Sequence, residues 1–451
     1  MNTTPVSTET TGRAQPIPAR LTQLVHQRVE GLSLDSEFYT SALVHDLDIA
    51  AIFAKHWIYV AADAELPEPG DYVTITVGPY SVILVRDDDD QVSALHNVCR
   101  HRGARILNDA SGSVGNLVCG YHHWTYGTDG SLLHADSQPA DFDRSCFALK
   151  KVAVRSIAGL IFICLSAEPP EDFDSVAQRI ESYLTPHQLM RTKVAAQEDL
   201  VEEGNWKLVM ENNRECYHCD GHPELSCSLF PTYGYEPDGL PARLRPAYDR
   251  YLRAEADLRR VSADNGLPFE RIQELETPVT GFRIQREPLD GAGESFSPDG
   301  RIVSNKLLGD LTEPRLGRLS MHWQPNAWFH FLSDHAVTFS VVPLAADRTL
   351  LRTTWLVHED AVEGHDYDLQ ELKRVWKQTN AQDGVFVQRA QRGVSSPAYQ
   401  PGPYAPNEYQ VEAFCSWYIN RLRAHVEAES WNGSSAALDD AAGGDGLEVF
   451  P

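Results

Sequence analysis

The sequence predicts an α+β protein in which a compact antiparallel β domain precedes a larger domain of mixed helices and strands. Two observations predict this order. Between about residues 70 and 165, short β-rich runs alternate with clusters of turn residues, which is typical of an antiparallel β domain. Beyond that point, apolar residues recur at helical spacing in segments mixed with longer strands.

The β domain is recognisable from four runs of strand-forming residues. They are YVTITV, PYSVILVR, QVSALHNV and LIFICLS, and a polar turn at residues 87–90 separates the second from the third. β-branched and aromatic residues bounded by turn residues favour strands. We expect this domain to span residues 57–168, and we expect residues 1–56 to pack against the larger domain.

The larger domain is expected at residues 169–430. Helical periods begin at 173–184 and recur in NWKLVMENNRECYH and DYDLQELKRVWKQTNAQDGVFVQRAQRG. The final stretch, residues 431–451, is small, acidic and rich in glycine. Such a composition cannot bury enough apolar surface to order itself, so we expect a disordered tail.

Charge and apolar content exclude several classes of function. The 39 basic and 64 acidic side chains give a net charge of −25, which opposes binding to nucleic acid or to an anionic membrane and leaves cationic small molecules as compatible ligands. The longest apolar run, near residues 160–165, is too short to span a bilayer. We therefore expect a cytoplasmic protein. Its eight cysteines lack the spacing of a disulfide scaffold, so reduced thiols or metal ligands are expected.

The first candidate metal site consists of two cysteines and two histidines. Cys99 and His101 form a C-x-H pair, Cys119 and His122 form a C-x2-H pair, and 17 residues separate the two pairs. If one iron takes both thiolates and the other both imidazoles, the result is a mixed-ligand [2Fe–2S] cluster. A structural zinc site is the alternative, although zinc fingers usually separate their cysteine and histidine pairs.

The strings CRHRG and CGYHHWTYGTDG resemble the Rieske motif of ring-hydroxylating and related oxygenases. The resemblance implies that Cys99 and Cys119 hold the inner iron and that His101 and His122 hold the outer one. His123 is displaced from the motif and is interpreted as a packing residue. Trp124 is interpreted as a wall of the cluster.

The second candidate site lies in the segment NWKLVMENNRECYHCDGHPEL. Glu211, Glu215, His218 and His222 recur at spacings of four, three and four, which places them on one face if a helix continues through the segment. Gly221 and the proline after His222 end such a helix, so His222 is expected in a turn.

Two histidines and one carboxylate form the facial triad of non-haem Fe(II) oxygenases. In the helix expected near residues 367–392, Asp383 takes a position of the apolar stripe that runs from Leu372 to Ala390. A buried carboxylate is costly unless it is paired or binds a metal, so Asp383 is chosen as the third ligand. The competing candidates are Asp220, Glu215 and Asp334.

A different site is also compatible with this segment. Cys216 and Cys219 form a C-x2-C pair with Cys227 nearby, the pattern of a zinc or redox site. Zinc requires a fourth ligand, and a thioredoxin-like motif requires a βαβ context that this sequence lacks.

The segment NWKLVMENNRECYHC, with the later QD and QRG, resembles the catalytic domain of Rieske oxygenases, which implies a central antiparallel sheet flanked by helices. The strings ENNRECYHC, TTWLVHEDAVEGHDYDL and SSPAYQPGPYAP resemble the branch of glycine betaine monooxygenase and stachydrine demethylase, which acts on quaternary ammonium compounds. Two departures stand out. Glu215 replaces the aspartate of ring dioxygenases, and the three residues between His218 and His222 are one fewer than that branch has.

The resemblance implies an oxidative N-demethylation that releases formaldehyde. A flavin- or ferredoxin-type reductase that draws on NAD(P)H would supply the electrons. They would pass from the [2Fe–2S] cluster through His101 or His122 and Glu215 to Fe(II), and O2 would be the co-substrate. The transfer crosses between subunits in this family, so a homotrimer is expected.

A quaternary ammonium head is best bound by aromatic faces. The candidate substrate residues are Tyr217, Trp323, Trp328, Phe329, Phe331 and Tyr404, with Arg389 or His330 for a substrate carboxylate. The alternative functions are an aromatic ring-hydroxylating dioxygenase and a non-enzymatic Rieske-type electron carrier or zinc-stabilised binding protein.

Overall fold

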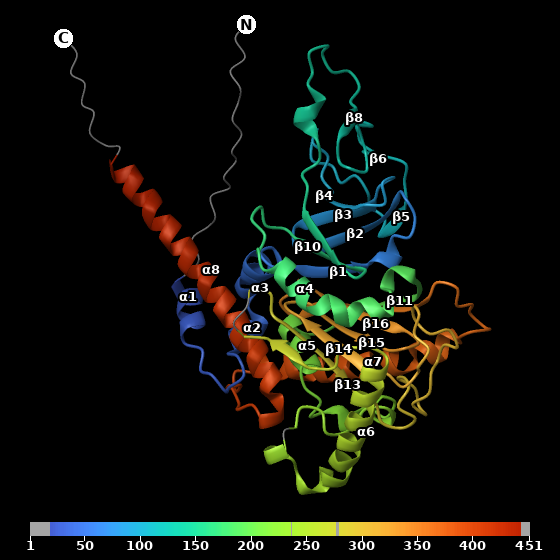
Figure 1. The fold of residues 1–451 in the computed structure, drawn as a ribbon. Helices are drawn as coiled ribbons and strands as arrows, with labels where there is room; N and C mark the ends of the chain where they lie inside the picture. The colour runs from blue at the N-terminus through green and yellow to red at the C-terminus, as the bar shows by residue number, and fades with distance from the viewer. Residues whose placement is uncertain (1–18, 236, 277–278, 443–451) are drawn as a thin grey trace, which may run out of the picture.

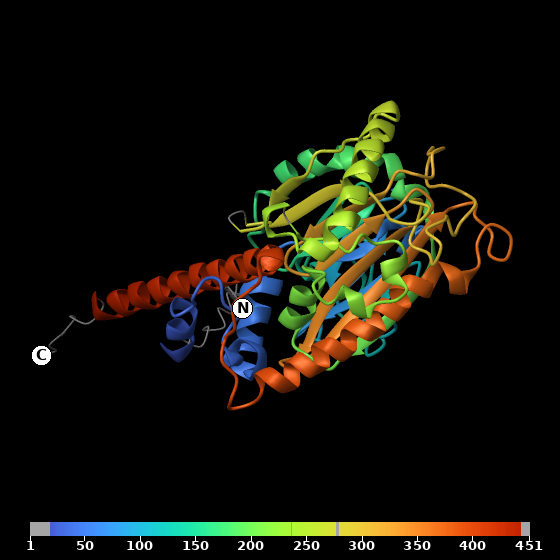
Figure 2. The same ribbon diagram turned by 90° about the horizontal axis from the view of Figure 1, so that it is seen from below.

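A computed structural model describes residues 19–235, 237–276 and 279–442 (Figure 1). A small β domain stands on a larger domain that is built around one sheet. Figure 2, seen from below, shows α7 lying along the sheet and α8 projecting from it. Within the described ranges, no helix combines the length and the apolar character needed to cross a membrane.

The small domain contains three antiparallel sheets. They are β1-β10-β9, β4-β3-β2-β5 and β6-β7-β8. The strands are β1 (Ile58–Ala62), β2 (Asp71–Val77), β3 (Tyr80–Arg86), β4 (Val92–His96), β5 (Ser111–Ser113), β6 (Leu117–Val118), β7 (Thr125–Tyr126), β8 (Leu132–His134), β9 (Ala153–Ile157) and β10 (Leu160–Cys164). The four runs expected to be strands therefore form β2, β3, β4 and β10.

The larger domain contains one antiparallel sheet of seven strands in the order β11-β17-β16-β15-β14-β13-β12. Its strands are β11 (Thr192–Glu202), β12 (Ile272–Glu274), β13 (Phe282–Glu287), β14 (Arg318–Trp323), β15 (Ala327–Phe331), β16 (Ala336–Ala345) and β17 (Arg348–His358). The central antiparallel sheet flanked by helices is thus confirmed.

Helices cover both faces of this sheet. They are α1 (Ala19–His26), α2 (Ser36–Thr40), α3 (Ala42–Asp48), α4 (Phe173–Leu184), α5 (Trp206–Asn213), α6 (Arg245–Asp264), α7 (Leu369–Val394) and α8 (Tyr409–Ala442). On one face, α5, α7 and α8 bury a large apolar core. On the other, α4 and β10 bury a second one. The N-terminal helices α1 and α2 contact α8 and α7.

On β13, β14 and β15, apolar side chains point to one face of the sheet and polar side chains to the other. Because successive side chains point to opposite faces, Phe282, Ile284, Leu319, Met321, Trp323, Ala327, Phe329 and Phe331 enter the core beneath α4. The intervening residues, including Arg283, Glu287, Arg318 and His322, point the other way. Antiparallel register sets Arg283 opposite His322 and Glu287 opposite Arg318. One face of these strands is therefore polar although it is buried.

Two helix boundaries differ from expectation. The helix expected over residues 205–218 ends at Asn213, so Glu215, His218 and His222 lie beyond it and do not share a helical face with Glu211. In the stretch expected to be disordered, α8 continues to Ala442, and its alanines at 436, 437, 441 and 442 are strong helix formers. Residues 443–451 lie outside the described ranges.

Candidate metal centres

Three side chains from two segments converge in the larger domain. His218 Nε2 and His222 Nε2 each lie 3.1 Å from Oδ1 of Asp383. Asp383 comes from α7, while the two histidines come from the turns that follow α5. The sequence expectation that a turn carries His222 agrees with its position directly after the 3₁₀ turn Cys219–Gly221.

The outer nitrogens of both imidazoles are hydrogen-bonded. His218 Nδ1 donates to Glu215 at 2.5 Å, and His222 Nδ1 donates to the amide oxygen of Gln382 at 2.8 Å. Gln382 is held in this orientation because its amide nitrogen donates to Glu224. Each ring therefore turns the lone pair of its Nε2 toward Asp383, the arrangement that protein metal sites use to fix the tautomer of a histidine ligand.

The donor set fits a divalent cation. His222 is fully buried, and its Nε2 has no hydrogen-bond partner. The amide nitrogen of Asn212 lies 3.2 Å from Nε2 of His218, so this nitrogen accepts a hydrogen bond when His218 is neutral. Two lone pairs and a carboxylate oxygen facing one another are unfavourable without a positive charge between them, and two histidines with one carboxylate suit Fe(II).

The pKa shifts at the site also favour a positive charge between His218 and Asp383. Burial favours a neutral His218, but the hydrogen bonds to Asp383 and Glu215 outweigh burial and raise the pKa of His218 to about 9. Burial also favours a neutral Asp383, yet the two imidazoles lower its pKa. A metal ion that binds here displaces a proton held between these groups.

Local sequence explains why the turns reach this position. Asn205 caps α5 by accepting from the backbone N–H of Lys207, and α5 ends just before the histidines. Gly221 lies against Phe386, and a Cβ at this glycine would come within 3.2 Å of the ring. Phe386 packs edge-on against both imidazoles. Asp383 itself is partly buried, with a side chain 20% exposed, and Ala390 of the expected apolar stripe is exposed.

The carboxylates other than Asp383 have other partners where the structure describes their side chains. Glu211, which the sequence pattern placed on one face with the histidines, accepts a hydrogen bond from Tyr39 at 2.9 Å. Asp334 is fully buried and binds Ser295, His335 and the backbone N–H of Val303. The side chain of Asp220 lies outside the described residues. Glu215 binds the outer nitrogen of His218 and not the side that faces Asp383.

Cys216 and Cys219 are joined by a disulfide in this structure, contrary to the expectation of reduced thiols. The sulfur of Cys219 lies within 4.8 Å of ligand atoms of His218 and His222. Because it is bonded to Cys216, it does not offer a thiolate to the same metal, which argues against the C-x2-C zinc interpretation. Cys227 is an exposed free thiol.

The second group of metal ligands lies in the small domain. The imidazoles of His101 and His122 are 4.5 Å apart between ring centroids, and Cys99 and Cys119 are buried among apolar side chains. Trp124 stacks on His101 at 4.9 Å, consistent with its interpretation as a wall. The hydroxyl of Tyr126 lies 3.3 Å from the sulfur of Cys99. Two inner thiols and two outer imidazoles match the donor chemistry of a mixed-ligand [2Fe–2S] cluster.

His123 gives the second loop its shape. Its φ of 57° is in the left-handed region, which costs a non-glycine residue some energy and is retained where the surrounding structure requires it. The backbone N–H of His123 donates to the carbonyl of Cys119, and the N–H of Cys119 donates to the carbonyl of Trp124. The loop closes tightly as a result, and His123 points into solvent.

Two cavities adjoin the His218 site. The inner one, of about 50 Å³, is lined by His218, His222, Asp383, Trp376 and His330, among others. The outer one, of about 310 Å³, is lined by residues of β13, β14 and α6. Three residues, Leu229, Tyr233 and Arg318, line both. Ligand pockets usually measure about 300–1,000 Å³, so a substrate needs part of the outer cavity.

The structure does not bring most of the expected aromatic residues to these cavities. Trp323, Phe329 and Phe331 lie on the opposite face of the sheet. Trp328 is stacked on Phe339, Tyr404 contacts Cys415, and Tyr217 is 59% exposed. Arg389 is exposed on α7. Of the residues named for substrate binding, only His330 lines the inner cavity.

The residues that do line the cavities had no clear signal in the sequence. Arg283 and Arg318 alternate with apolar residues on β13 and β14, a pattern that indicates a strand with one face toward solvent. Tyr233 and Trp376 had no signal either, because only the packing of distant segments places them beside His218.

Comparison with known proteins identifies the class. The Rieske [2Fe-2S] domain family matches residues 56–153, and the ring hydroxylating alpha subunit (catalytic domain) family matches residues 189–424. The glycine betaine monooxygenase oxygenase subunit of Chromohalobacter salexigens is 41% identical over 415 residues, covering 90% of this chain and 89% of that protein. Its namesake in Pseudomonas aeruginosa is 38% identical over 430 residues, covering 94% and 97%.

Solved structures share the fold. A quaternary ammonium Rieske monooxygenase superposes with a TM-score of 0.65 at 22% identity, covering 90% of this chain and 99% of that one. Naphthalene 1,2-dioxygenase from a Rhodococcus species does so with a TM-score of 0.62 at 17% identity, with the same coverage of both chains.

The chain belongs to the Rieske non-haem iron oxygenases, as a catalytic alpha subunit. It is therefore an enzyme that carries a Rieske [2Fe–2S] cluster and a mononuclear iron and uses O2 with electrons from a reductase. The resemblance inferred from CRHRG and CGYHHWTYGTDG is confirmed. The zinc-protein and electron-carrier interpretations are discarded.

Proposed function

We propose that this oxygenase removes an N-methyl group from a quaternary ammonium compound, such as glycine betaine or stachydrine, and releases it as formaldehyde. The observation that carries the proposal is the identity of 38–41%, over 90–94% of the chain, to two oxygenase subunits named for glycine betaine. Relatives named for carnitine match about 43% of the chain at 34% identity.

The site residues have distinct roles in this proposal. His218, His222 and Asp383 hold the mononuclear iron, and Cys99, Cys119, His101 and His122 hold the cluster. The bound iron supplies the activation of O2 that hydroxylation of a C–H bond requires. Trp376 and Tyr233 line the inner cavity. The guanidinium of Arg318 already lies over the ring of Tyr233, so Trp376 is the proposed aromatic contact for the ammonium group, worth about 0.5–2 kcal/mol.

The overall reaction balances without a further reactant. One methyl C–H bond, O2, two electrons and two protons give an N-hydroxymethyl ammonium and water. The hydroxyl then loses its proton as the carbon–nitrogen bond breaks, and the bond electrons stay on nitrogen. The products are a tertiary amine, formaldehyde and one proton. Closure of the small inner cavity around the methyl group limits competing oxidation.

We also propose a homotrimer in which Glu215 lies at the contact between subunits. Figure 1 places β6, which directly precedes Cys119, high in the small domain, whereas α5 and α7 lie within the larger domain. A head-to-tail contact that closes into a ring brings the cluster loops of one subunit to Glu215 of the next. Glu215 already holds Nδ1 of His218.

The test is a reconstituted turnover assay with iron-loaded protein, a flavin-dependent reductase, NADH and O2. Glycine betaine and stachydrine are compared with naphthalene. We expect one formaldehyde for each O2 consumed with a betaine. A cis-diol from the arene, with no formaldehyde from any betaine, contradicts the proposal and supports a ring dioxygenase.

A further inference from the structure

We infer that two buried arginines that line the cavities, Arg283 and Arg318, form a binding site for the carboxylate of the substrate, with the charge of Arg214 close to Arg283. The inference rests on the proposed function. It narrows the substrate from quaternary ammonium compounds in general to zwitterions that carry a carboxylate close to the ammonium group.

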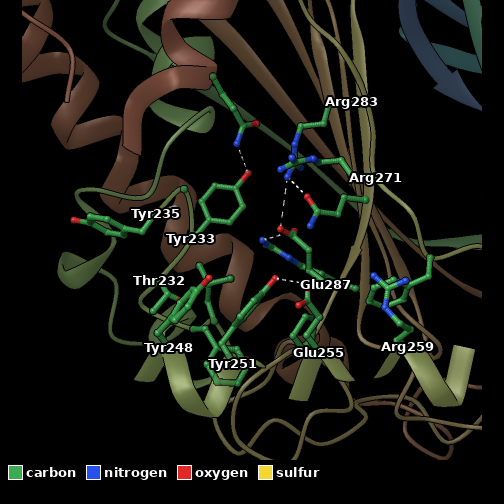
Figure 3. Close-up of a pocket in the computed structure, with 18 of the residues that line it drawn as sticks. Thr232, Tyr233, Tyr235, Tyr248, Tyr251, Glu255, Arg259, Arg271, Arg283 and Glu287 are labelled. Atoms are coloured by element: carbon green, nitrogen blue, oxygen red, sulfur yellow. Dashed lines mark hydrogen bonds and ion pairs between the residues drawn. The ribbon is translucent and has the colours of Figure 1, made fainter. Parts of the chain in front are cut away.

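Arg318 is placed where such a group has to bind. It lines the inner cavity together with His218 and Asp383, and it also lines the outer cavity. Arg283 lies one strand away on β13, in the outer cavity. Figure 3 shows Arg283 and Glu287 facing Tyr233 across this cavity, with Tyr248 and Tyr251 projecting from α6. A short zwitterion with its methyl groups near the iron ligands therefore directs its other end toward Arg318.

The arginines have unused donors. Arg214, Arg283 and Arg318 are 0–5% exposed. Nε and Nη2 of Arg214, Nη1 of Arg283 and Nε of Arg318 are buried and have no hydrogen-bond partner. A buried donor without a partner costs about 1–3 kcal/mol, and more when it is charged. An acceptor that enters the cavity recovers this loss.

The positive charge is also undercompensated. Glu287 lies 2.9 Å from Nη2 of Arg318 and 3.7 Å from Nη2 of Arg283, so two guanidiniums share one carboxylate. Arg214 donates to the neutral side chain of Asn213 at 2.9 Å, and no carboxylate pairs with it within the ranges that the structure describes. Burial and the nearby charge of Arg283 lower the pKa of Arg214 to about 9.

The remaining acids of the outer cavity are already engaged. Glu255 accepts from the hydroxyl of Tyr251 at 3.1 Å, and Glu270 pairs with Arg259 near the rim. They do not neutralise the arginines beside the inner cavity. Against a chain charge of −25, this group of buried arginines is a local exception.

The geometry favours a carboxylate as the occupant. Guanidinium groups bind carboxylates through two parallel hydrogen bonds, which fixes the orientation of the ligand as well as its charge. The same positive group opposes a ligand that carries only an ammonium charge, because its cation has no partner there. Repulsion of choline and attraction of glycine betaine thus have one physical origin.

The test uses four small probes and does not depend on turnover. Glycine betaine carries both charges, and choline replaces the carboxylate by an alcohol. The carbon isosteres 3,3-dimethylbutyrate and 3,3-dimethylbutanol lack the ammonium charge. Equilibrium binding to the iron-loaded enzyme is measured by calorimetry. We expect the wild type to bind glycine betaine at least about 10-fold more tightly than choline, and 3,3-dimethylbutyrate more tightly than its alcohol.

The variant Arg318→Met is expected to bind glycine betaine and 3,3-dimethylbutyrate about 10–100-fold more weakly than the wild type does. Its affinity for choline is expected to be unchanged or higher. Arg318→Lys is expected to recover part of the loss. Arg286→Met is the matched control, because Arg286 is equally buried on β13 but points to the opposite face. If Arg318→Met does not fold, Arg283→Met takes its place, because Arg283 also lines the outer cavity.

Two results overturn the inference. One is equal weakening of the binding of all ligands by Arg318→Met, or by Arg283→Met where it is used, which indicates a structural role. The other is wild-type affinity for choline that matches that of glycine betaine. The proposed function is judged separately by formaldehyde: if the wild type releases it from glycine betaine while either result holds, only the carboxylate site is lost. If no betaine binds and none yields formaldehyde, the proposed function fails too.

Discussion

Asp383 and Gln382, which are neighbours on α7, contact opposite nitrogens of the imidazole of His222. Oδ1 of Asp383 lies 3.1 Å from Nε2, and the amide oxygen of Gln382 accepts from Nδ1 at 2.8 Å. One turn of a helix thus fixes both the tautomer and the direction of a candidate iron ligand that comes from another segment.

The first prediction concerns Asp383. Its replacement by alanine removes the only carboxylate that faces both histidines among the described residues, so the protein is expected to retain two irons per chain and lose the third. Metal analysis checks the count, and the signal of the reduced [2Fe–2S] cluster should persist in electron paramagnetic resonance. Asp334→Asn should keep three irons. Full turnover by Asp383→Ala would refute the triad.

The second prediction concerns Gln382. In Gln382→Ala, the Nδ1 of His222 loses its acceptor and the ring is no longer held in one tautomer, so iron affinity should fall by about 10–100-fold. Titration of the apoprotein with Fe(II) under anaerobic conditions measures this. Gln378→Ala, one helical turn earlier and exposed, is the control and should leave the affinity unchanged. Unaltered affinity in Gln382→Ala would mean that Gln382 does not orient His222.

The third prediction separates the triad from a thiolate site. Replacing both Cys216 and Cys219 by serine removes the disulfide but none of the three proposed ligands, so the mononuclear iron content should stay at one per chain. Loss of that iron in the double variant, with the cluster intact, would instead support a thiolate ligand. Cys227→Ser serves as the control, since this thiol is exposed and free.

The fourth prediction tests the aromatic wall. Trp376→Leu removes a ring face of the inner cavity, so KM for the ammonium substrate should rise by about 2–30-fold, which corresponds to a cation–π contribution of roughly 0.5–2 kcal/mol. Trp323→Leu truncates a tryptophan on the other face of the sheet. It should lower stability and leave KM unchanged. The reverse pattern would place the substrate on the opposite side.

The fifth prediction concerns pH and Glu211. Burial raises the pKa of this carboxyl to about 7, against partial opposition from Tyr39 and Lys207. Between the pKa of the unfolded chain, about 4.5, and that of the folded protein, the folded state binds more protons, so Glu211 reduces the free energy of unfolding as pH rises. The reduction is complete above pH 7 and amounts to roughly 3 kcal/mol.

Glu211→Gln removes this titration while keeping an oxygen that can accept from Tyr39. Its Tm relative to the wild type should therefore increase from about pH 5 to about pH 8. Differential scanning calorimetry at the two pH values checks this, with the exposed Glu203→Gln as control. A difference in Tm that does not change with pH would show that Glu211 ionises normally in the fold.

The local patterns of the sequence were sufficient for the strands of the small domain and for α4 and α7. The proposed cluster ligands Cys99, His101, Cys119 and His122 also follow from local patterns, because they lie in two short loops that are each closed by backbone hydrogen bonds. The choice of Asp383 as the third proposed iron ligand also came from a single helix. A carboxylate among apolar positions is unfavourable unless it is paired or binds a metal.

Only the tertiary structure decided which residues line the cavities. The sequence shows that Trp323 and Phe331 are aromatic, but it does not show which side of the sheet they face. Side chains alternate between the two sides of a strand, and when both sides are buried this alternation does not identify the side that faces the cavities. Tyr233, Arg318 and Trp376 come from three separate segments and line the inner cavity. Their meeting beside His218 depends on sheet register and on the packing of α7, and both are long-range properties that no local pattern contains.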